Sequence, residues 1–190
     1  MDKNTLVIHP KDPSTDCLEV IYEGRGWTVI RDFDTQNEEV VRQIQAHDRI
    51  ILLGHGTPNG LLAGSMVKLC SGKQIFHQFS RYIIDGSHAA LLRVKETISI
   101  WCHSDAYFRH FRAGHGLHTG MIISEVSEEF YCLGRAVLNE KQMADNMKLF
   151  CGTFAKNIDL PPKEMKKKVL EEYVGDDEVT RYNRDRIIVL

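Results

Sequence analysis

Short runs of aliphatic and β-branched residues alternate with stretches in which apolar residues recur at helical spacing. Three such runs, at 5–9, 27–33 and 49–53, predict strands. The two stretches between them place apolar residues on one helical face, and we expect Ser14 and Thr35 to begin these helices as capping residues. This β-α-β-α-β order predicts a parallel sheet with right-handed crossover connections.

The pattern continues beyond residue 53 with weaker signals. Its clearest part is a strand over 97–101, followed by a helix over 105–112 and a flexible, glycine-rich loop over 114–120. Residues 65–81 show no clear pattern. The further elements that we expect are a small hairpin around 60–64, strands at 82–85, 121–124 and 187–190, and helical segments at 86–93, 125–133, 139–156 and 162–175.

The order of these elements predicts the fold class. We expect one α/β domain over residues 1–190, built as a three-layer α-β-α sandwich with a mostly parallel central sheet. The helices over 139–175 are expected to pack on the same sheet. A chain of 190 residues can bury a sizeable core, and its 43% hydrophobic and 26% charged residues are ordinary for a globular protein.

Charge and cysteine usage exclude several classes of function. The formal net charge of −2 provides no excess of positive charge for binding nucleic acid or an anionic membrane surface. No stretch approaches the roughly 20 apolar residues that span a bilayer, and we expect no signal peptide. The five cysteines form no Cys-x-x-Cys pair, so neither a disulfide framework nor a zinc finger is expected. A reducing cytoplasm is the expected location.

Two predicted strands end on residues that can carry chemistry. His55 follows the strand at 49–53, and Cys102 follows the strand at 97–101. Ligands of open α/β sheets bind at the carboxyl ends of the strands, and neighbouring strands lie only about 4.8 Å apart. We expect His55 and Cys102 to form one site, with helix N-terminal amides favouring the thiolate. The amides of Gly56 and Cys102 are expected to form an oxyanion hole.

These residues resemble the caspase-like cysteine peptidases of clan CD. Gly54-His55-Gly56 after one strand looks like their histidine motif, and Cys102-His103-Ser104 after a later strand is nearest to the metacaspases. The resemblance covers roughly residues 5–134. It implies a caspase-like fold and a cysteine endopeptidase in which Cys102 forms an acyl-enzyme and His55 transfers protons. It also implies a peptide or protein substrate and no metal or organic cofactor.

The sequence departs from that family beside the cysteine. Metacaspases have an acidic residue before the nucleophile, and this chain has Trp101. The Gln-Ala-Cys-Arg-Gly motif of caspases is absent. Asp105 and His103 are the further candidates for the substrate pocket beside Trp101, although Asp105 also suits a helix cap. We expect a single chain that needs no processing.

Other interpretations remain open. The same fold can serve as a catalytically silent binding or scaffold module, and Cys102 can be an ordinary core cysteine. A metal-dependent hydrolase would use Cys102 with His103, His110, His115 and His118, although their spacing matches no standard zinc site. An activated Cys102 predicts faster reaction with iodoacetamide than at the other four cysteines. The sequence leaves the oligomeric state open.

Overall fold

A six-stranded sheet forms the centre of the molecule. The computed structural model describes residues 3–32, 34–63, 65–70, 74–79 and 81–190, with only the backbone described in 65–70 and 74–79. Five parallel strands and a final antiparallel one lie in the order β2-β1-β3-β9-β10-β11. The strands are β1 (Thr5–Ile8), β2 (Thr28–Ile30), β3 (Arg49–Leu53), β9 (Glu96–Ile100), β10 (His115–Thr119) and β11 (Ile187–Val189).

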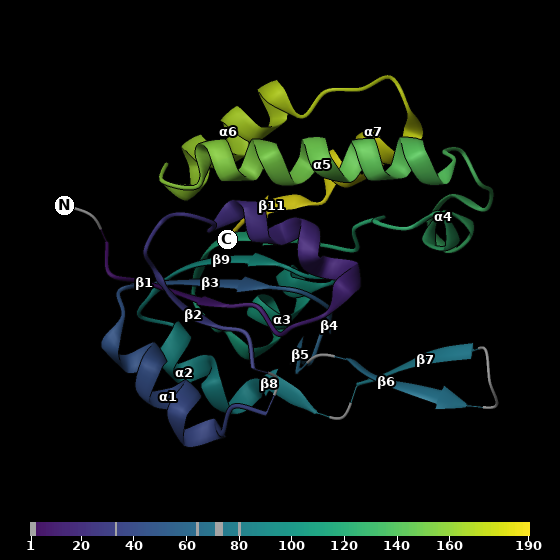
Figure 1. Cartoon of the computed structure of the whole chain (residues 1–190). Helices are drawn as coiled ribbons and strands as arrows, with labels where there is room; N and C mark the ends of the chain where they lie inside the picture. Colours follow the sequence, from purple (N-terminus) through teal and green to yellow (C-terminus); the bar gives the residue numbers. More distant parts are fainter. Residues whose placement is uncertain (1–2, 33, 64, 71–73, 80) are drawn as a thin grey trace.

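Helices cover both faces of this sheet (Figure 1). Alternate residues of β3 face opposite sides, so that Ile51 and Leu53 join one core and Ile50 and Leu52 the other. The 3-10 helix η1 (Pro13–Ile21), α4 (Val126–Leu133), α5 (Glu140–Asn157), α6 (Pro162–Glu172) and α7 (Glu178–Asp185) contribute to the first core. The second core holds residues of α1 (Asn37–Ala46), α2 (Ala89–Leu92) and α3 (Ser104–Phe111).

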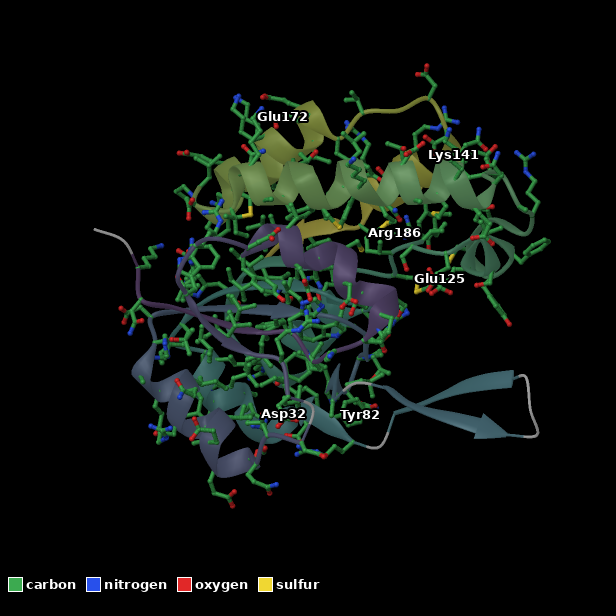
Figure 2. The ribbon with its side chains drawn as sticks, viewed as in Figure 1. Asp32, Tyr82, Glu125, Lys141, Glu172 and Arg186 are labelled. Carbon is green, nitrogen blue, oxygen red and sulfur yellow. The ribbon has the colours of Figure 1, made fainter. Side chains whose placement is uncertain are left out.

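The expected α/β architecture with a mostly parallel sheet is confirmed. Phe150 and Phe154 of α5 belong to one buried cluster with Val7 and Ile51 of the sheet. Figure 2 shows side chains filling the space between helices and sheet, with the exposed Lys141 near the start of α5. Among the described residues, no helix combines the length and the apolarity needed to cross a bilayer.

A smaller sheet follows β3. It contains β4 (Gly56–Thr57), β5 (Gly60–Leu62) and β8 (Tyr82–Ile84), after which comes the short 3-10 helix η2 (Gly86–His88). The expected hairpin therefore exists, but its turn lies at 58–59 rather than within 60–64. The stretch without a clear pattern holds a second hairpin, β6 (Ser65–Cys70) and β7 (Gln74–Phe79), which extends away from the helical layers in Figure 1.

The expected loop at 114–120 and strand at 121–124 are both wrong. Residues His115–Thr119 form β10, which pairs with β9 in parallel, and 121–124 contain no strand. A Cβ atom on Gly116 would lie 1.8 Å from the carbonyl oxygen of Thr97. The glycine therefore permits a close approach of two strands and is not a sign of flexibility.

Two expected caps are also wrong. The first helical segment is a 3-10 helix whose N-cap is Asp12, and its side chain accepts a hydrogen bond from the amide of Ser14. The helix α1 begins after Gln36, without a side-chain cap from Thr35. Helix α7 was not anticipated from the pattern. In each case a short polar stretch contains several residues at which a helix could begin, and tertiary packing determines which one it is.

Candidate active site

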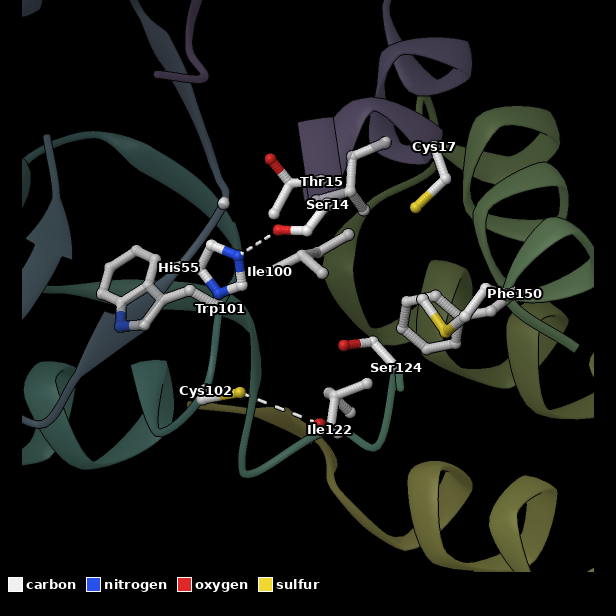
Figure 3. A pocket seen from close by; sticks show the side chains of 13 residues that line it. Ser14, Thr15, Cys17, His55, Ile100, Trp101, Cys102, Ile122, Ser124 and Phe150 are labelled. Atoms are coloured by element: carbon white, nitrogen blue, oxygen red, sulfur yellow. Dashed lines mark hydrogen bonds between the residues drawn. The ribbon is translucent and has the colours of Figure 1, made fainter. Parts of the chain in front are cut away.

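The strands β3 and β9 bring His55 and Cys102 to the same edge of the sheet. Leu53 pairs with Ile100 at the ends of these neighbouring strands, and each candidate residue follows its strand end by two positions. The amide of Gly54 continues the pairing by donating to the carbonyl of Ile100 at 3.2 Å. One narrow pocket, with a cavity volume of about 40 Å³, is lined by both His55 and Cys102 (Figure 3).

The turn that carries Cys102 is hydrogen-bonded to β10. Ser104, at the start of α3, is fully buried; its hydroxyl lies 2.8 Å from both the amide and the carbonyl of Thr119. The hydroxyl of Thr119 donates to the carbonyl of Trp101 at 2.9 Å. His103 takes a left-handed conformation with φ of 68°, which side chains other than glycine seldom adopt. The backbone around Cys102 is therefore held on both sides.

Cys102 is a protonated thiol at neutral pH. Burial raises its pKa to about 11, and the negative charge of Glu128 adds to this. The sulfur also donates a hydrogen bond to the carbonyl of Ile122 at 3.8 Å, a contact that only the protonated thiol can make. The expectation of a thiolate favoured by helix amides is wrong, because desolvation outweighs the dipole at this position. A nucleophilic role then requires a base.

His55 supplies an imidazole at the mouth of the pocket. Its side chain is 29% exposed, and its Nε2 atom lies 2.6 Å from the hydroxyl oxygen of Ser14. Figure 3 shows the ring between Ser14 and Cys102, with Nε2 on the side of Ser14. The Ser14 hydroxyl donates in turn to Oδ1 of the buried Asp12 at 2.8 Å.

Gly56 and Trp101 form a wall beside these two residues. Trp101 is 2% exposed, and its indole nitrogen donates to the carbonyl of Thr57 at 3.2 Å. A Cβ atom on Gly56 would lie 2.1 Å from the Trp101 ring, so only glycine fits there. The amide of Leu62 donates to the carbonyl of His55. The next pair of the antiparallel ladder, Gly56 and Leu61, is one that exchanges no hydrogen bonds, so the Gly56 amide points away from β5.

The other predicted pocket residues lie elsewhere. Asp105 sits in the first turn of α3, with its carboxylate 3.9 Å from Nε of Arg109. His103 is exposed at the preceding turn. Neither lines the pocket that contains His55 and Cys102. The structure thus brings His55, Cys102 and Trp101 together and leaves Asp105 and His103 outside.

Several lining residues were missed in the sequence. They come from η1, from the segment after β10 and from α5, and they are Ser14, Thr15, Cys17, Leu18, Ile122, Ser124, Met147 and Phe150. The useful signal was Asp12-Pro13-Ser14 directly after the first strand, because a polar turn there lies at the same sheet edge. The residues of α5 carry no such signal, since their pattern is that of any core helix.

Cys17 is the sulfur most open to reagents in this pocket. Its residue is exposed, and a hydrogen bond from the thiol of Cys151 lowers its pKa. The same bond raises the pKa of Cys151, which is buried. The structure therefore favours alkylation at Cys17 over Cys102, which is opposite to the expected order.

The histidines of the 103–118 stretch do not gather. His118 is fully buried, and its ring stacks on Phe108 with centroids 3.9 Å apart, whereas His110 and His115 are exposed. Burial lowers the pKa of His118 to about 3. Within the described ranges, no three His, Cys, Asp or Glu side chains are grouped as they would be to ligate a metal ion.

Comparison with models of known protein families finds no match, and comparison with curated protein sequences finds none either.

Proposed function

We propose that this protein is a cysteine hydrolase of caspase-like type, an endopeptidase that uses His55 and Cys102 as a dyad. One observation carries the proposal: a histidine and a cysteine from the carboxyl ends of two neighbouring parallel strands line one pocket. This arrangement agrees with what the motif resemblance implies. Nucleophilic catalysis also needs a base near the nucleophile, and His55 is the imidazole that lines the pocket with Cys102.

The reaction begins with the protonated thiol. His55 accepts the proton of Cys102 as the sulfur attacks the peptide carbonyl carbon, which removes the need for a preformed thiolate. The amides of Gly56 and Cys102 hold the oxyanion. The His55 imidazolium then donates its proton to the leaving amine as the C–N bond breaks. Water, deprotonated by His55, hydrolyses the thioester and regenerates the thiol.

The lining suggests the kind of peptide. Around the dyad the walls are mainly apolar, with Leu18, Ile122 and Phe150 among them. Trp101 stands where metacaspases have an acidic residue, and Asp105 lies outside the pocket. We therefore expect an apolar side chain next to the cleaved bond, since a basic one would lose its hydration there without a paired carboxylate.

A fluorogenic peptide library tests this function. The full chain is expected to cleave peptides with apolar residues before the reporter group, and Cys102→Ala removes that cleavage. Cys132→Ser is the matched control, because Cys132 is a partly buried cysteine of α4 that does not line the pocket. Cleavage that persists in Cys102→Ala, or that disappears equally in Cys132→Ser, contradicts the proposal.

Alkylation is a second measurement on the same residues. At neutral pH and limiting iodoacetamide, mass spectrometry is expected to find the label on Cys17 before Cys102. A peptide carrying an electrophilic ketone depends on the dyad geometry and is expected to label Cys102 instead. Equal labelling of both cysteines by both reagents argues against an organised dyad.

A catalytically silent binding module is the second candidate. The observation that favours it is the raised pKa of Cys102 together with its sulfur contact to Ile122. A silent module predicts no cleavage of any library peptide and no labelling of Cys102 by the ketone. Saturable binding of an apolar peptide, lost when Phe150→Ala opens the pocket wall, would then identify its function.

A further inference from the structure

We propose that Asp12 and Ser14 are positioning residues that fix the tautomer of His55, with the proton on Nε2 and Nδ1 as the base. The inference rests on the proposed function for its catalytic consequence. Its structural part rests on three hydrogen-bonding groups from two segments that are distant in sequence. Asp12 and Ser14 lie at the start of η1, and His55 follows β3.

The direction of the hydrogen bonds follows from chemistry. Ser14 Oγ lies 2.8 Å from Oδ1 of Asp12 and 2.6 Å from Nε2 of His55. An ionised carboxylate has no proton to donate, so the single hydroxyl proton of Ser14 goes to Asp12. The Ser14 oxygen must then accept from His55, which requires a proton on Nε2. The unprotonated nitrogen is Nδ1.

The backbone that carries this carboxylate is held firmly. Asp12 is 2% exposed, and its main-chain carbonyl accepts from both the amide and the hydroxyl of Thr15. That hydroxyl lies 3.1 Å from Nε2 of His9, whose Nδ1 lies 2.7 Å from an Arg31 nitrogen. Arginine can only donate, so His9 accepts at Nδ1 and donates to Thr15. This chain of bonds keeps Asp12 in one orientation.

A charge effect accompanies the orientation. Oδ2 of Asp12 lies 3.9 Å from Nε2 of His55. When His55 takes the proton of Cys102, a buried carboxylate is already beside the new imidazolium. The pairing stabilises the ion in a site where solvent screening is weak. Asp12 and Ser14 thus act on the reaction through His55, without touching the substrate.

A purely structural role for Asp12 is the competing interpretation, because its side chain also caps η1. Asparagine caps helices as well as aspartate does, so Asp12→Asn keeps the cap and removes the charge. The amide also places an N–H donor near Nε2, which favours the opposite tautomer. Ser14→Ala removes the bridging hydroxyl, and Ser14→Thr retains it.

The molecule contains a matched control. Asp85, Gly86 and Ser87 form a second Asp-x-Ser cap, the remote cap, in which Ser87 donates to Asp85 from both its amide and its hydroxyl. None of these residues lines the pocket. Asp85→Asn and Ser87→Ala therefore report what the same two substitutions do to folding alone.

Nitrogen NMR of the full chain with isotope-labelled histidine measures the tautomer directly. We expect His55 to carry its proton on Nε2 in the wild type and in the remote-cap variants. In Asp12→Asn and Ser14→Ala a substantial fraction moves to Nδ1, and Ser14→Thr restores the wild-type form. An Nδ1 proton in the wild type, or an unchanged tautomer in Ser14→Ala, overturns the inference.

Kinetics on the fluorogenic peptide complete the test. Asp12→Asn and Ser14→Ala are expected to lower kcat by roughly 10- to 100-fold with little change in KM, because orientation and not binding is lost. If cleavage needs Cys102 and His55 but not Asp12 or Ser14, the inference alone fails. If the tautomer shifts as expected while Cys102→Ala still cleaves, the proposed function alone fails.

Discussion

The molecule has two Asp-x-Ser caps, each with a histidine, and they differ in where the histidine comes from. In the site cap (Asp12, Pro13 and Ser14) the partner is His55, which follows a different strand and stays 29% exposed at a pocket. In the remote cap the partner is His88, from the same turn, and it is 2% exposed. The same local motif thus joins distant segments in one place and closes on itself in the other.

The hydrogen bonds explain this difference. Nδ1 of His88 accepts the amide of its own cap residue, Asp85, at 3.2 Å, which completes a capping box. Its ring is committed to the turn. The His55 ring uses Nε2 toward Ser14 and faces Cys102 on its other side (Figure 3). A cap becomes part of a candidate site only when it holds a side chain that belongs to another element.

Removing each histidine gives the largest expected contrast. His55→Ala is expected to lower peptide turnover by about 10²- to 10⁴-fold, the usual contribution of a general acid–base group. His88→Ala is expected to leave turnover per folded molecule unchanged and to reduce the free energy of unfolding by about 1–3 kcal/mol, since a buried, hydrogen-bonded ring is lost. Kinetics and urea unfolding of both variants measure the two effects. A similar loss of turnover in both variants would remove the functional distinction between the caps.

The two caps are also expected to differ in their response to acid. Burial and the charge of Arg31 lower the pKa of His9, which supports the site cap, to about 3. The unfolded chain binds this proton near pH 6.5, so folding stability falls as pH decreases from 6.5 toward 3, by up to about 1.4 kcal/mol per pH unit. His9→Gln is expected to flatten that slope, which urea unfolding at several pH values measures. His118 contributes in the same window, so the slope decreases without vanishing.

The remote cap responds only at lower pH. Burial of Asp85 opposes its ionisation, but hydrogen bonds from Ser87 outweigh burial and hold the pKa of Asp85 below its usual value. Its contribution to stability is present above the unfolded pKa, about 3.9, and is lost as pH falls through the lower folded value. Asp85→Asn is expected to change the pH dependence of unfolding only below about pH 4. A change near pH 6 would contradict this expectation.

The central residues of the caps give the smallest expected contrast. A Cβ atom on Gly86 would lie 2.6 Å from the Phe111 ring, so Gly86→Ala is expected to cost about 1 kcal/mol as the ring shifts. Pro13→Ala increases the conformational entropy of the unfolded chain and is expected to lower the free energy of unfolding by about 0.5 kcal/mol. Urea unfolding of both variants tests this order. The reverse order would show that Phe111 accommodates the methyl group freely.

The sequence predicted the central fold because burial on both faces makes parallel strands visible as apolar runs. Arg49–Leu53 and Glu96–Ile100 are such strands, and their ends gave His55 and Cys102 directly. The strand His115–Thr119 was missed because Gly116 and the glycines that flank the strand resemble those of a loop. Gly116 permits a close approach to Thr97, a neighbour that the local pattern does not reveal.

The candidate site was less predictable than the sheet. The pKa of Cys102 depends on burial by residues far away in sequence, and no local motif encodes that burial. The link from Asp12 through Ser14 to His55 was missed for a related reason. Ser14 was interpreted as a local cap, whereas its oxygen bonds a histidine that lies beyond two intervening strands.

The high pKa of Cys102 has a consequence for oxidative damage. Peroxides react with thiolates and scarcely with thiols, so the resting Cys102 resists conversion to sulfenic acid. Cys17, exposed in the same pocket and with a lowered pKa, is the sulfur that oxidants meet first. In a cell under oxidative stress, Cys102 would therefore remain reduced longer than Cys17.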